Sequence, residues 1–358
     1  MRRYRRRMRK NPVVAVLCLF SSALAVGVTP AESVGSPCRV GVLLPGEDTG
    51  KQWGAHRREL ANDFKAARVT ACIFRTNDPR TQSRQAGEAM SRGAKVLVLA
   101  GLRSPASASI EARAATKGVT VIDYDRLTPK GSAAYFVSFD NESIGKLQAQ
   151  ALQACFRTAK TYNTHPLIAQ LNGPSDDIGA ALMARGFNDV LEPLYASGTF
   201  RRGPIMAVPE WTTDAARGVF RSMVRQTGRT LGGMVTADDR FAHGAISVIT
   251  AKHLRRIPIG GQGATFQGIR NIVARSQCAT MYKPAKWQAD AASNLALSLL
   301  RGKDPVGINA KINDGARDVP SVLVPVVPIT KRNYFLMFSE GIYRRKDVCG
   351  GSLERLCF

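Results

Sequence analysis

The sequence has few of the residues on which catalytic and metal-binding sites are commonly built. Its 358 residues include only four histidines, which are scattered along the chain, and no two cysteines stand in a C-x-x-C spacing. Nucleophile-elbow, P-loop and His-Glu-x-x-His motifs are missing as well. The sequence therefore predicts a protein that is not an enzyme and that holds neither a metal nor a cofactor. We expect the histidines on the surface or within helices.

Two local patterns resemble enzyme motifs. The segment Gly260-Gly261-Gln262-Gly263 follows a predicted strand, as a dinucleotide-binding loop does, but it lacks the full glycine spacing and belongs to a late strand. Asp176 and Asp177 are adjacent acids, whereas a glycosidase needs two carboxylates at a defined separation across the scissile bond. Neither pattern outweighs the interpretation of the chain as non-catalytic.

Acidic residues are scarce, at 27 Asp and Glu against 51 Lys and Arg, which gives a net charge of +24. The basic residues are dispersed, however, and pairs such as Arg57-Arg58 and Arg255-Arg256 lie far apart. A nucleic-acid-binding stripe of basic and aromatic residues is not present. The charge surplus therefore predicts a solvated basic surface that faces anionic wall or lipid, with no nucleic-acid partner.

Long hydrophobic runs are also scarce. An apolar run from Val13 to Val28 follows the basic segment Met1–Lys10 and contains the small-residue site Ala23-Leu24-Ala25. This order is typical of a secretory signal peptide, which we place at residues 1–33. An uncleaved membrane anchor is the alternative, although the run is short for a full span. We expect an exported, extracytoplasmic protein, in the periplasm, at the cell surface or secreted.

Six cysteines follow the predicted signal peptide, and an even count in an oxidising compartment suggests disulfides. Two pairings have physical support. Cys38 and Cys72 lie on the first two predicted strands, which are neighbours in a doubly wound sheet. Cys349 and Cys357 would close a short C-terminal loop.

Short apolar runs alternate with longer amphipathic stretches along the rest of the chain. Two of these stretches have apolar residues at helical spacing, Ile144–Cys155 and Trp287–Leu300. Alternation of strands and helices predicts a parallel sheet with helices on both faces. The predicted strands are Arg39–Leu44, Val69–Phe74, Lys95–Ala100, Val119–Tyr124, Leu167–Leu171, Pro204–Val208, Gly233–Thr236, Ile257–Gly260 and Ala279–Tyr282.

The chain is too long for one such sheet, so we expect two lobes. The fold class is α/β, with two doubly wound parallel-sheet (Rossmann-like) lobes joined by a multi-strand hinge. Breaks near Tyr135–Asn141, Met281–Pro284 and Val319–Val327 suggest three crossings. They predict an N-terminal lobe of residues 38–138 and 284–318, a C-terminal lobe of 139–283 and 319–345, and a tail of 346–358.

The strand Val119–Tyr124 ends abruptly in Asp125 and Arg126. The carboxyl edge of a parallel sheet is where open α/β sheets bind ligands. An adjacent carboxylate and guanidinium can together accept from and donate to the hydroxyls of a polyhydroxylated molecule. A structural ion pair at a strand end is the alternative.

Other polar residues follow predicted strands in the same way. Two tryptophans, Trp53 and Trp211, also lie just beyond strand ends, where flat aromatic rings can stack on sugar C–H surfaces. The third, Trp287, falls in a helical pattern and is expected to pack. The polar residues at strand ends are Asp177, Asp238, Gln262 and Lys283.

Several motifs together carry a family resemblance. From Cys38 to about Glu340 the chain resembles the D-xylose-binding proteins of bacterial ABC transporters, within the type I periplasmic sugar-binding superfamily. The matching motifs are Tyr124-Asp125-Arg126, Ser138-Phe139-Asp140-Asn141-Glu142, Gly145-Lys146-Leu147-Gln148-Ala149, Gly261-Gln262, Tyr282-Lys283-Pro284 and Gly315-Ala316-Arg317-Asp318-Val319-Pro320-Ser321.

The resemblance implies a pentose site between the lobes. It implies that Trp53 and Trp211 stack on the sugar ring, and that four side chains bond the hydroxyls: Asp125, Arg126, Asp177 and Lys283. Three more candidate ligand-binding residues occupy neighbouring positions: Gln52, Asp238 and Gln262.

This chain departs from the family pattern at four positions. Gln52 stands where the family has Arg before the first tryptophan, and Gly179 stands where it has Asn. Asp238-Asp239 replaces an Asn-Asp pair, and Gly263 replaces the acid of a Gly-Gln-Asp motif. The last change removes a carboxylate from the expected site, so a carbohydrate-like ligand is predicted more firmly than xylose itself.

The sequence thus predicts a monomeric, exported solute-binding protein that captures a small, pentose-like carbohydrate and delivers it to an ABC-type sugar permease in the membrane. A sugar-sensing receptor that presents its ligand to a membrane sensor kinase is the alternative, since both use the same closing cleft. A transcription repressor would need an N-terminal helix-turn-helix where the signal peptide is predicted.

Overall fold

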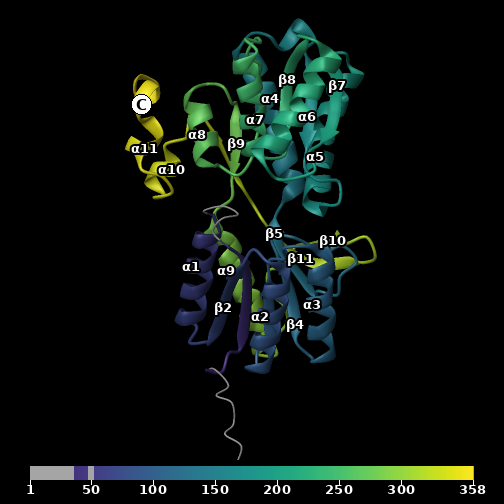
Figure 1. The fold of residues 1–358 in the computed structure, drawn as a ribbon, viewed down its shortest axis with the longest axis vertical. Coiled ribbons are helices and arrows are strands. Elements are labelled where there is room, and N and C mark those ends of the chain that lie inside the picture. Colours follow the sequence, from purple (N-terminus) through teal and green to yellow (C-terminus); the bar gives the residue numbers. More distant parts are fainter. Residues whose placement is uncertain (1–35, 47–51, 358) are drawn as a thin grey trace, which may run out of the picture. The chain divides into compact units, whose positions relative to one another are not determined.

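The computed structural model describes residues 36–46 and 52–357, which belong to one compact unit. The predicted signal peptide therefore lies outside the described residues. Two lobes with separate sheets and separate cores make up this unit (Figure 1). No helix within the described ranges has the length and hydrophobicity of a membrane span.

The N-terminal lobe is built on a seven-stranded sheet in the order β10-β11-β5-β4-β3-β1-β2. All neighbouring strands are parallel except β10 and β11. The strands are β1 (Val40–Pro45), β2 (Ala71–Thr76), β3 (Val96–Leu99), β4 (Thr120–Tyr124), β5 (Tyr135–Phe139), β10 (Ala310–Asn313) and β11 (Asp318–Val324).

Helices cover both faces of this sheet, as the apolar runs predict. On β1, Val40 and Val42 face a core that α1 and α9 complete, and Leu43 faces a second core that α2 and α3 complete. Because both faces are covered, the strand reads as a continuous apolar run. The helices are α1 (Gln52–Ala66), α2 (Pro79–Ser91), α3 (Ser104–Thr116) and α9 (Ala285–Leu300).

The C-terminal lobe has the strand order β7-β6-β8, extended by bridges through Ile259 and Gly260 to the antiparallel pair β9-β12. Its strands are β6 (Leu167–Asn172), β7 (Arg201–Ala207), β8 (Leu231–Thr236), β9 (Ala279–Tyr282) and β12 (Val327–Thr330). Its helices are α4 (Asn141–Thr158), η2 (Tyr162–Thr164), α5 (Ile178–Ala196), α6 (Thr213–Thr227), α7 (Asp239–Ala251) and α8 (Phe266–Val273). The predicted two-lobed α/β fold is confirmed.

One predicted boundary is misplaced. Residues 319–324 were assigned to the C-terminal lobe, but β11 pairs in parallel with β5 and belongs to the N-terminal sheet. Phe139 and Val324 are paired at the ends of these strands, and both side chains enter the C-terminal core. The two strands therefore cross between the lobes together, after Val324.

The predicted tail is also wrong. Residues 346–357 are largely helical, in α11 (Arg345–Cys349) and η3 (Gly351–Leu356), and follow the short α10 (Leu336–Ser339). Val348, Cys349 and Leu353 are buried in a core shared with α8. This end of the chain is a packed element of the C-terminal lobe.

The disulfides differ in part from expectation. The Cys349–Cys357 bridge is confirmed, and a second bridge joins Cys155 on α4 to Cys278. The predicted Cys38–Cys72 pairing is wrong, because both cysteines are free and buried. The Cys38 thiol donates to the carbonyl of Ala89 (3.6 Å), and burial raises its pKa to about 12.

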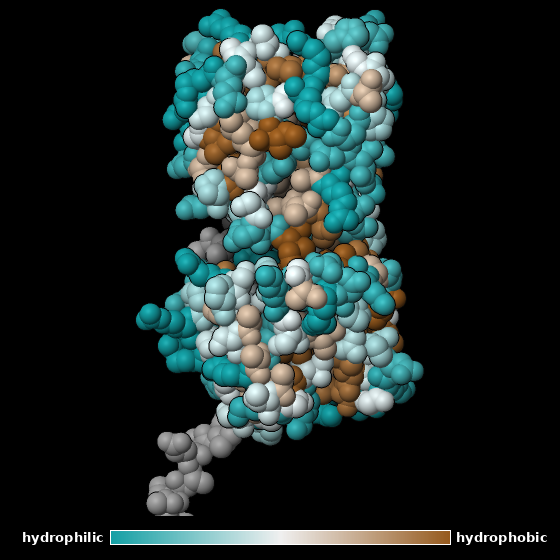
Figure 2. Space-filling view, turned by 90° about the vertical axis from the view of Figure 1, so that its right-hand side faces the viewer, coloured by the Kyte–Doolittle hydropathy of each residue, from teal (hydrophilic) through white to brown (hydrophobic). Residues whose placement is uncertain are grey.

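Most of the face shown in Figure 2 is hydrophilic, and its hydrophobic side chains form small patches. Trp287 was expected to pack, but it is 43% exposed on α9.

The closest helix contact in the C-terminal lobe depends on glycine. A Cβ at Gly145 on α4 would lie 2.1 Å from the carbonyl oxygen of Met183 on α5, and a Cβ at Gly186 would lie 2.0 Å from that of Glu142. Backbone atoms cannot move aside as a flexible side chain can. The two glycines therefore set how closely α4 and α5 approach.

We expect Gly145→Ala to lower the free energy of unfolding by about 1–3 kcal/mol, the usual cost of overpacking. Gly87→Ala on α2 is the matched control, because a Cβ there meets nothing within 4 Å. This control should gain about 0.5–1 kcal/mol from helix propensity. Urea unfolding of both variants measures the difference, and equal stabilities would contradict the close approach of α4 and α5.

Candidate functional site

Asp125 begins the loop that follows β4, in a left-handed backbone conformation (φ 68°). Its amide donates to the carbonyl of Val137 (2.9 Å), and its carbonyl accepts from the Ser138 hydroxyl (3.2 Å). These bonds fix the backbone at the carboxyl edge of the N-terminal sheet, where the sequence predicts a ligand site. Asn and Asp tolerate such a conformation better than most residues.

The structure brings Asp125 together with Lys283. The Lys283 Nζ lies 3.9 Å from Asp125 Oδ1, and the two side chains are 19% and 18% exposed. Lys283 Nζ also lies 5.6 Å from the centre of the Phe139 ring. Lys283 directly follows β9, so this pair joins polar groups from the ends of two strands in different sheets.

Arg126 does not pair with Asp125 in the described part of the chain. Its side chain is exposed, and Nη1 lies 3.4 Å from the carbonyl oxygen of Gly101, just beyond β3. The structural Asp125–Arg126 ion pair, which was the alternative interpretation, therefore does not form in the described part of the chain. Arg126 remains at the edge of the sheet with donors to spare.

An aromatic cluster lies behind Asp125. Trp53 is only 2% exposed, and its ring centre is 5.2 Å from that of His56 and 6.4 Å from that of Tyr124. His56 Nδ1 lies 2.6 Å from the Tyr124 hydroxyl, and burial, together with the charge of Lys283, lowers the pKa of His56 to about 4. The imidazole is thus neutral near pH 7. Stacking of Trp53 on a ligand stays a prediction, since its ring lies within the core.

Trp211 is the partly exposed tryptophan of the C-terminal lobe. Its ring stacks on Phe241, with centres 5.3 Å apart and planes inclined by 13°. The ring also borders the turn after β6, because a Cβ at Gly173 would lie 2.5 Å from it. Phe241 therefore fixes the plane of the indole beside the turn that follows β6.

Asp177 and Asp238 both cap helices. Asp177 accepts from the amide of Ala180 at the start of α5 (3.0 Å). Asp238 is 5% exposed and accepts from Arg240 three times: from its amide (2.8 Å), Nε (2.8 Å) and Nη2 (3.0 Å). Helix capping and the Asp238–Arg240 ion pair account for these contacts, so ligand binding by either residue stays a prediction.

Two buried amide oxygens at strand ends have no partner. Gln262 is 6% exposed, and its Oε1 has no hydrogen-bond donor within the described ranges. The same holds for Oδ1 of Asn172, the last residue of β6. Buried polar atoms nearly always have a hydrogen-bond partner, and a buried atom without one lowers the stability of the protein by about 1–3 kcal/mol. A ligand hydroxyl or a water is the natural donor at both positions.

Asn172 was not among the predicted site residues. Its position at the start of the polar segment after β6 was the available signal, but sequence cannot tell which amide is left unpaired. Gln52 begins α1, and its side chain lies outside the described part of the structure.

A buried carboxylate supports the segment that carries Gln262. Asp239 accepts from Gln277 Nε2 (2.6 Å), the Thr265 amide (2.8 Å) and the Thr280 hydroxyl (2.9 Å). Burial raises the pKa of Asp239 to about 7, against the effect of these donors. The Asp239 amide donates to the carbonyl of Gln262 (2.9 Å), so the acid and the candidate ligand residue are directly linked.

Gly263 explains one departure from the family pattern. Its φ is 111°, a conformation that side chains rarely adopt, although a Cβ there would meet only the Thr265 methyl at 3.5 Å. There is room for the side chain of an acid at this position, but an acid would strain the backbone at this positive φ. The segment as folded here suits the glycine.

No group of three or more His, Cys, Asp or Glu side chains in the described part of the chain could hold a metal ion.

A buried acid pair lies beneath the loop that Asp125 begins. Glu111 Oε2 accepts from the amide of Ala133 (2.8 Å), and Asp123 Oδ2 accepts from the amide of Thr128 (2.7 Å). The remaining oxygens, Glu111 Oε1 and Asp123 Oδ1, have no donor among the described residues. Burial, and next the charge of Glu111, raise the pKa of Asp123 well above its ordinary value. A protonated Asp123 carboxyl can donate to Glu111, which accounts for both oxygens.

This pair predicts a pH-dependent stability. The folded state keeps a proton that the unfolded chain releases above about pH 4, so the stability of the protein falls as pH rises from there through the folded pKa of Asp123. Asp123→Asn should flatten this slope and raise the melting temperature at alkaline pH, because the amide donates to Glu111 without a titrating proton. Glu111→Gln, the matched variant, should act in the same direction. Melting curves from pH 4 to 9 measure the slope, and a slope unchanged in both variants would contradict the raised pKa of Asp123.

Comparison with known proteins agrees with this geometry. Residues 40–304 match the model of a family described as periplasmic binding protein domain. The D-xylose-binding periplasmic protein of Haemophilus influenzae is 29% identical over 303 residues, which cover 83% of this chain and 88% of the relative. The multiple sugar-binding periplasmic receptor ChvE of Rhizobium radiobacter is 24% identical over 352 residues, covering 94% and 98%.

A solved structure has the same fold. The carbohydrate transporter solute-binding protein of Chloroflexus aurantiacus, in complex with D-glucose, superimposes with a TM-score of 0.75 at 23% identity. The match covers 87% of this chain and 98% of that one.

Proposed function

This chain belongs to the periplasmic binding protein family, and we propose that it captures a small, pentose-like carbohydrate between its two lobes and delivers it to an ABC-type sugar permease. The protein is extracytoplasmic and non-catalytic in this proposal. Ligand contacts from both lobes favour the closed arrangement over the open one, and the closed form is what a permease recognises.

The unpartnered amide oxygens of Asn172 and Gln262 support the proposal most directly. They are neutral acceptors at the carboxyl ends of strands in one lobe, next to the partly exposed indole of Trp211 in the case of Asn172. A neutral molecule rich in hydroxyls supplies the missing donors, and its C–H face suits an aromatic ring. An anionic or cationic ligand would not be favoured by such neutral groups.

The Asp125–Lys283 pair supports a polyhydroxylated ligand from the other side. Its 3.9 Å separation is longer than a direct hydrogen bond. One sugar hydroxyl can donate to the carboxylate and accept from the ammonium, which gives two charge-assisted hydrogen bonds. Exposed Arg126 offers further donors at the same sheet edge.

The identity of the sugar is left open by the departures from the family pattern. Asp238 is engaged with Arg240, and Gly263 contributes no carboxylate. The relatives are named for xylose in one case and for multiple sugars in another. We therefore propose a carbohydrate of pentose to hexose size.

A sugar-sensing receptor is the second candidate. The similarity to a protein named as a periplasmic receptor favours it. In that case the closed form would be presented to a membrane sensor kinase. Pull-down of membrane proteins with the sugar-loaded form distinguishes the two, since either a permease or a sensor kinase would be retained.

Sugar binding should raise the melting temperature. At a ligand concentration of one hundred times Kd the stabilisation is about 2.7 kcal/mol. The test is a panel of D-xylose, D-ribose, D-glucose and myo-inositol in a thermal-shift assay, with an unrelated amino acid as control. If no member of a wider panel that includes polyols and oligosaccharides shifts the melting curve at millimolar concentration, sugar capture loses its support.

Asp125→Asn should weaken the binding of the best sugar by about tenfold or more, because a hydrogen bond to a charged group contributes about 1.5–3 kcal/mol. Asparagine tolerates the left-handed backbone at this position. Asp290→Asn, which removes a surface acid paired with Lys286 on α9, is the control. Isothermal titration measures both. If Asp125→Asn binds the sugar with unchanged affinity, the Asp125–Lys283 pair has a structural role only.

A further inference from the structure

The C-terminal residues 331–357, here called the C-terminal cap, pack against the segment that carries Gln262. In Figure 1 the cap is the yellow end of the chain, at α10 and α11. Its buried residues Tyr334, Met337 and Val348 share one core with Ile269 and Ile272 of α8. The match to the family model ends at residue 304, so the cap lies beyond it.

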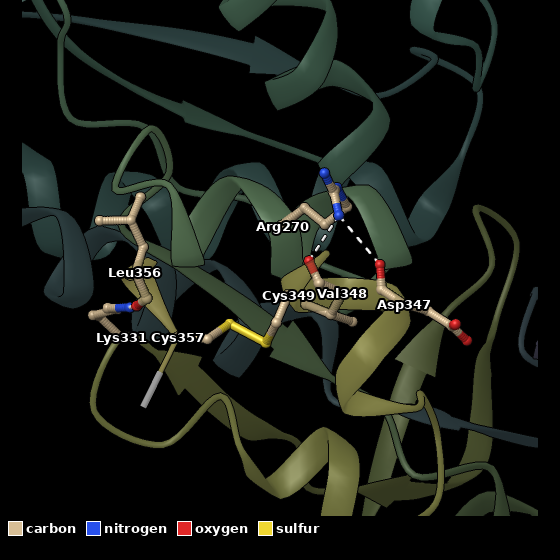
Figure 3. Close-up of a disulfide and its surroundings, with 7 residues drawn as sticks. All are labelled: Arg270, Lys331, Asp347, Val348, Cys349, Leu356 and Cys357. Carbon is tan, nitrogen blue, oxygen red and sulfur yellow. Dashed lines mark hydrogen bonds between the residues drawn. A yellow bond between two sulfur atoms is a disulfide. The ribbon is translucent and has the colours of Figure 1, made fainter. Parts of the chain in front are cut away.

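Several contacts anchor the cap to α8 (Figure 3). Arg270 Nη1 donates to the carbonyl oxygens of Val348 (2.7 Å) and Asp347 (3.2 Å), which end α11. The Cys349–Cys357 disulfide closes the last turn beside these carbonyls, and Lys331 Nζ donates to the carbonyl of Leu356. Arg270 thus joins the cap to α8, while the disulfide and the Lys331 bond join parts of the cap to one another.

Tyr343 connects the cap to residues 261–265, here called the Gln262 loop. Its hydroxyl donates to the carbonyl of Ala264 (3.0 Å), and its ring meets Phe266 edge-on with centres 5.5 Å apart. Burial raises the pKa of the Tyr343 hydroxyl, so the group stays protonated and remains a donor.

The Gln262 loop needs such support because its backbone is strained. Gly263 and Ala264 both have positive φ, at 111° and 44°, and alanine rarely adopts this conformation. The Gly263 amide donates to Met281 and the Ala264 amide to the Thr280 hydroxyl, both at 2.9 Å. The amides of Gly263 and Ala264 are thus hydrogen-bonded to β9, whereas the carbonyl of Ala264 is hydrogen-bonded to Tyr343 of the cap.

We propose that Tyr343 is a positioning residue for the ligand site, and that the cap acts through it to aim the unpartnered Gln262 side chain at the bound sugar. This inference rests on the proposed function of sugar capture. The residue that touches the ligand is Gln262, and Tyr343 sets the conformation of its loop. The cap is then part of the binding machinery, although it supplies no ligand contact of its own.

The test is Tyr343→Phe, which removes the hydroxyl and keeps the ring that packs on Phe266. Affinity for the sugar with the largest thermal shift, with D-xylose as the first probe, should fall about three- to tenfold, because a Gln262 loop released by the lost bond has to be ordered on binding. Tyr195→Phe on α5 is the matched control, since it removes a buried hydroxyl elsewhere in the same lobe. It should bind as the unmodified protein does.

Amide deuterium exchange of a peptide spanning residues 262–266, without sugar, gives a second readout. Exchange should be faster in Tyr343→Phe than in the unmodified protein and unchanged in Tyr195→Phe. Faster exchange with weaker binding supports the inference. Unchanged exchange, or unchanged affinity in a variant that binds sugar, overturns it.

If the unmodified protein binds no sugar of the panel, sugar capture fails, and the role of Tyr343 as a positioning residue for a sugar site fails with it. The exchange rate then reports separately whether Tyr343 holds the loop.

Discussion

The buried carboxylate of Asp239 holds together the carboxyl edge of the sheet in the C-terminal lobe. It gathers donors from the Thr265 amide, from Gln277 and from Thr280, and its own amide bonds the Gln262 carbonyl. Glycines at 261 and 268 make room for it, because a Cβ at either would lie within 2.6 Å of its oxygens. One acid thus joins the start of α7, the Gln262 loop, α8 and β9.

The strands were predictable because parallel strands covered on both faces are continuous apolar runs. The same reasoning did not predict β10 and β11. Polar residues alternate in these strands, and they form a hairpin before β11 pairs with β5. Residues 346–357 were predicted to be a tail because their few apolar residues acquire a core only against α8. Cys38 and Cys72 lie near each other as expected, yet proximity of strands does not fix the geometry of a disulfide.

The candidate site was predictable where it depends on position along a strand. Asp125 and Lys283 lie at strand ends because the runs before them are apolar. What sequence cannot supply is which polar atoms find partners: Asp238 is satisfied by Arg240, while Asn172 and Gln262 are not satisfied. The burial of Trp53 is equally a property of packing, set by His56 and Tyr124.

The Cys155–Cys278 bridge has a consequence for the biogenesis of the protein. It joins α4 to the residue before β9 across 123 positions, and such a large closed loop restricts the unfolded chain strongly, by about 4–5 kcal/mol in the entropic account. In a reducing compartment the two thiols stay separate, so the C-terminal lobe lacks this stabilisation there. The chain is therefore easier to unfold while these two cysteines are reduced than after they are oxidised.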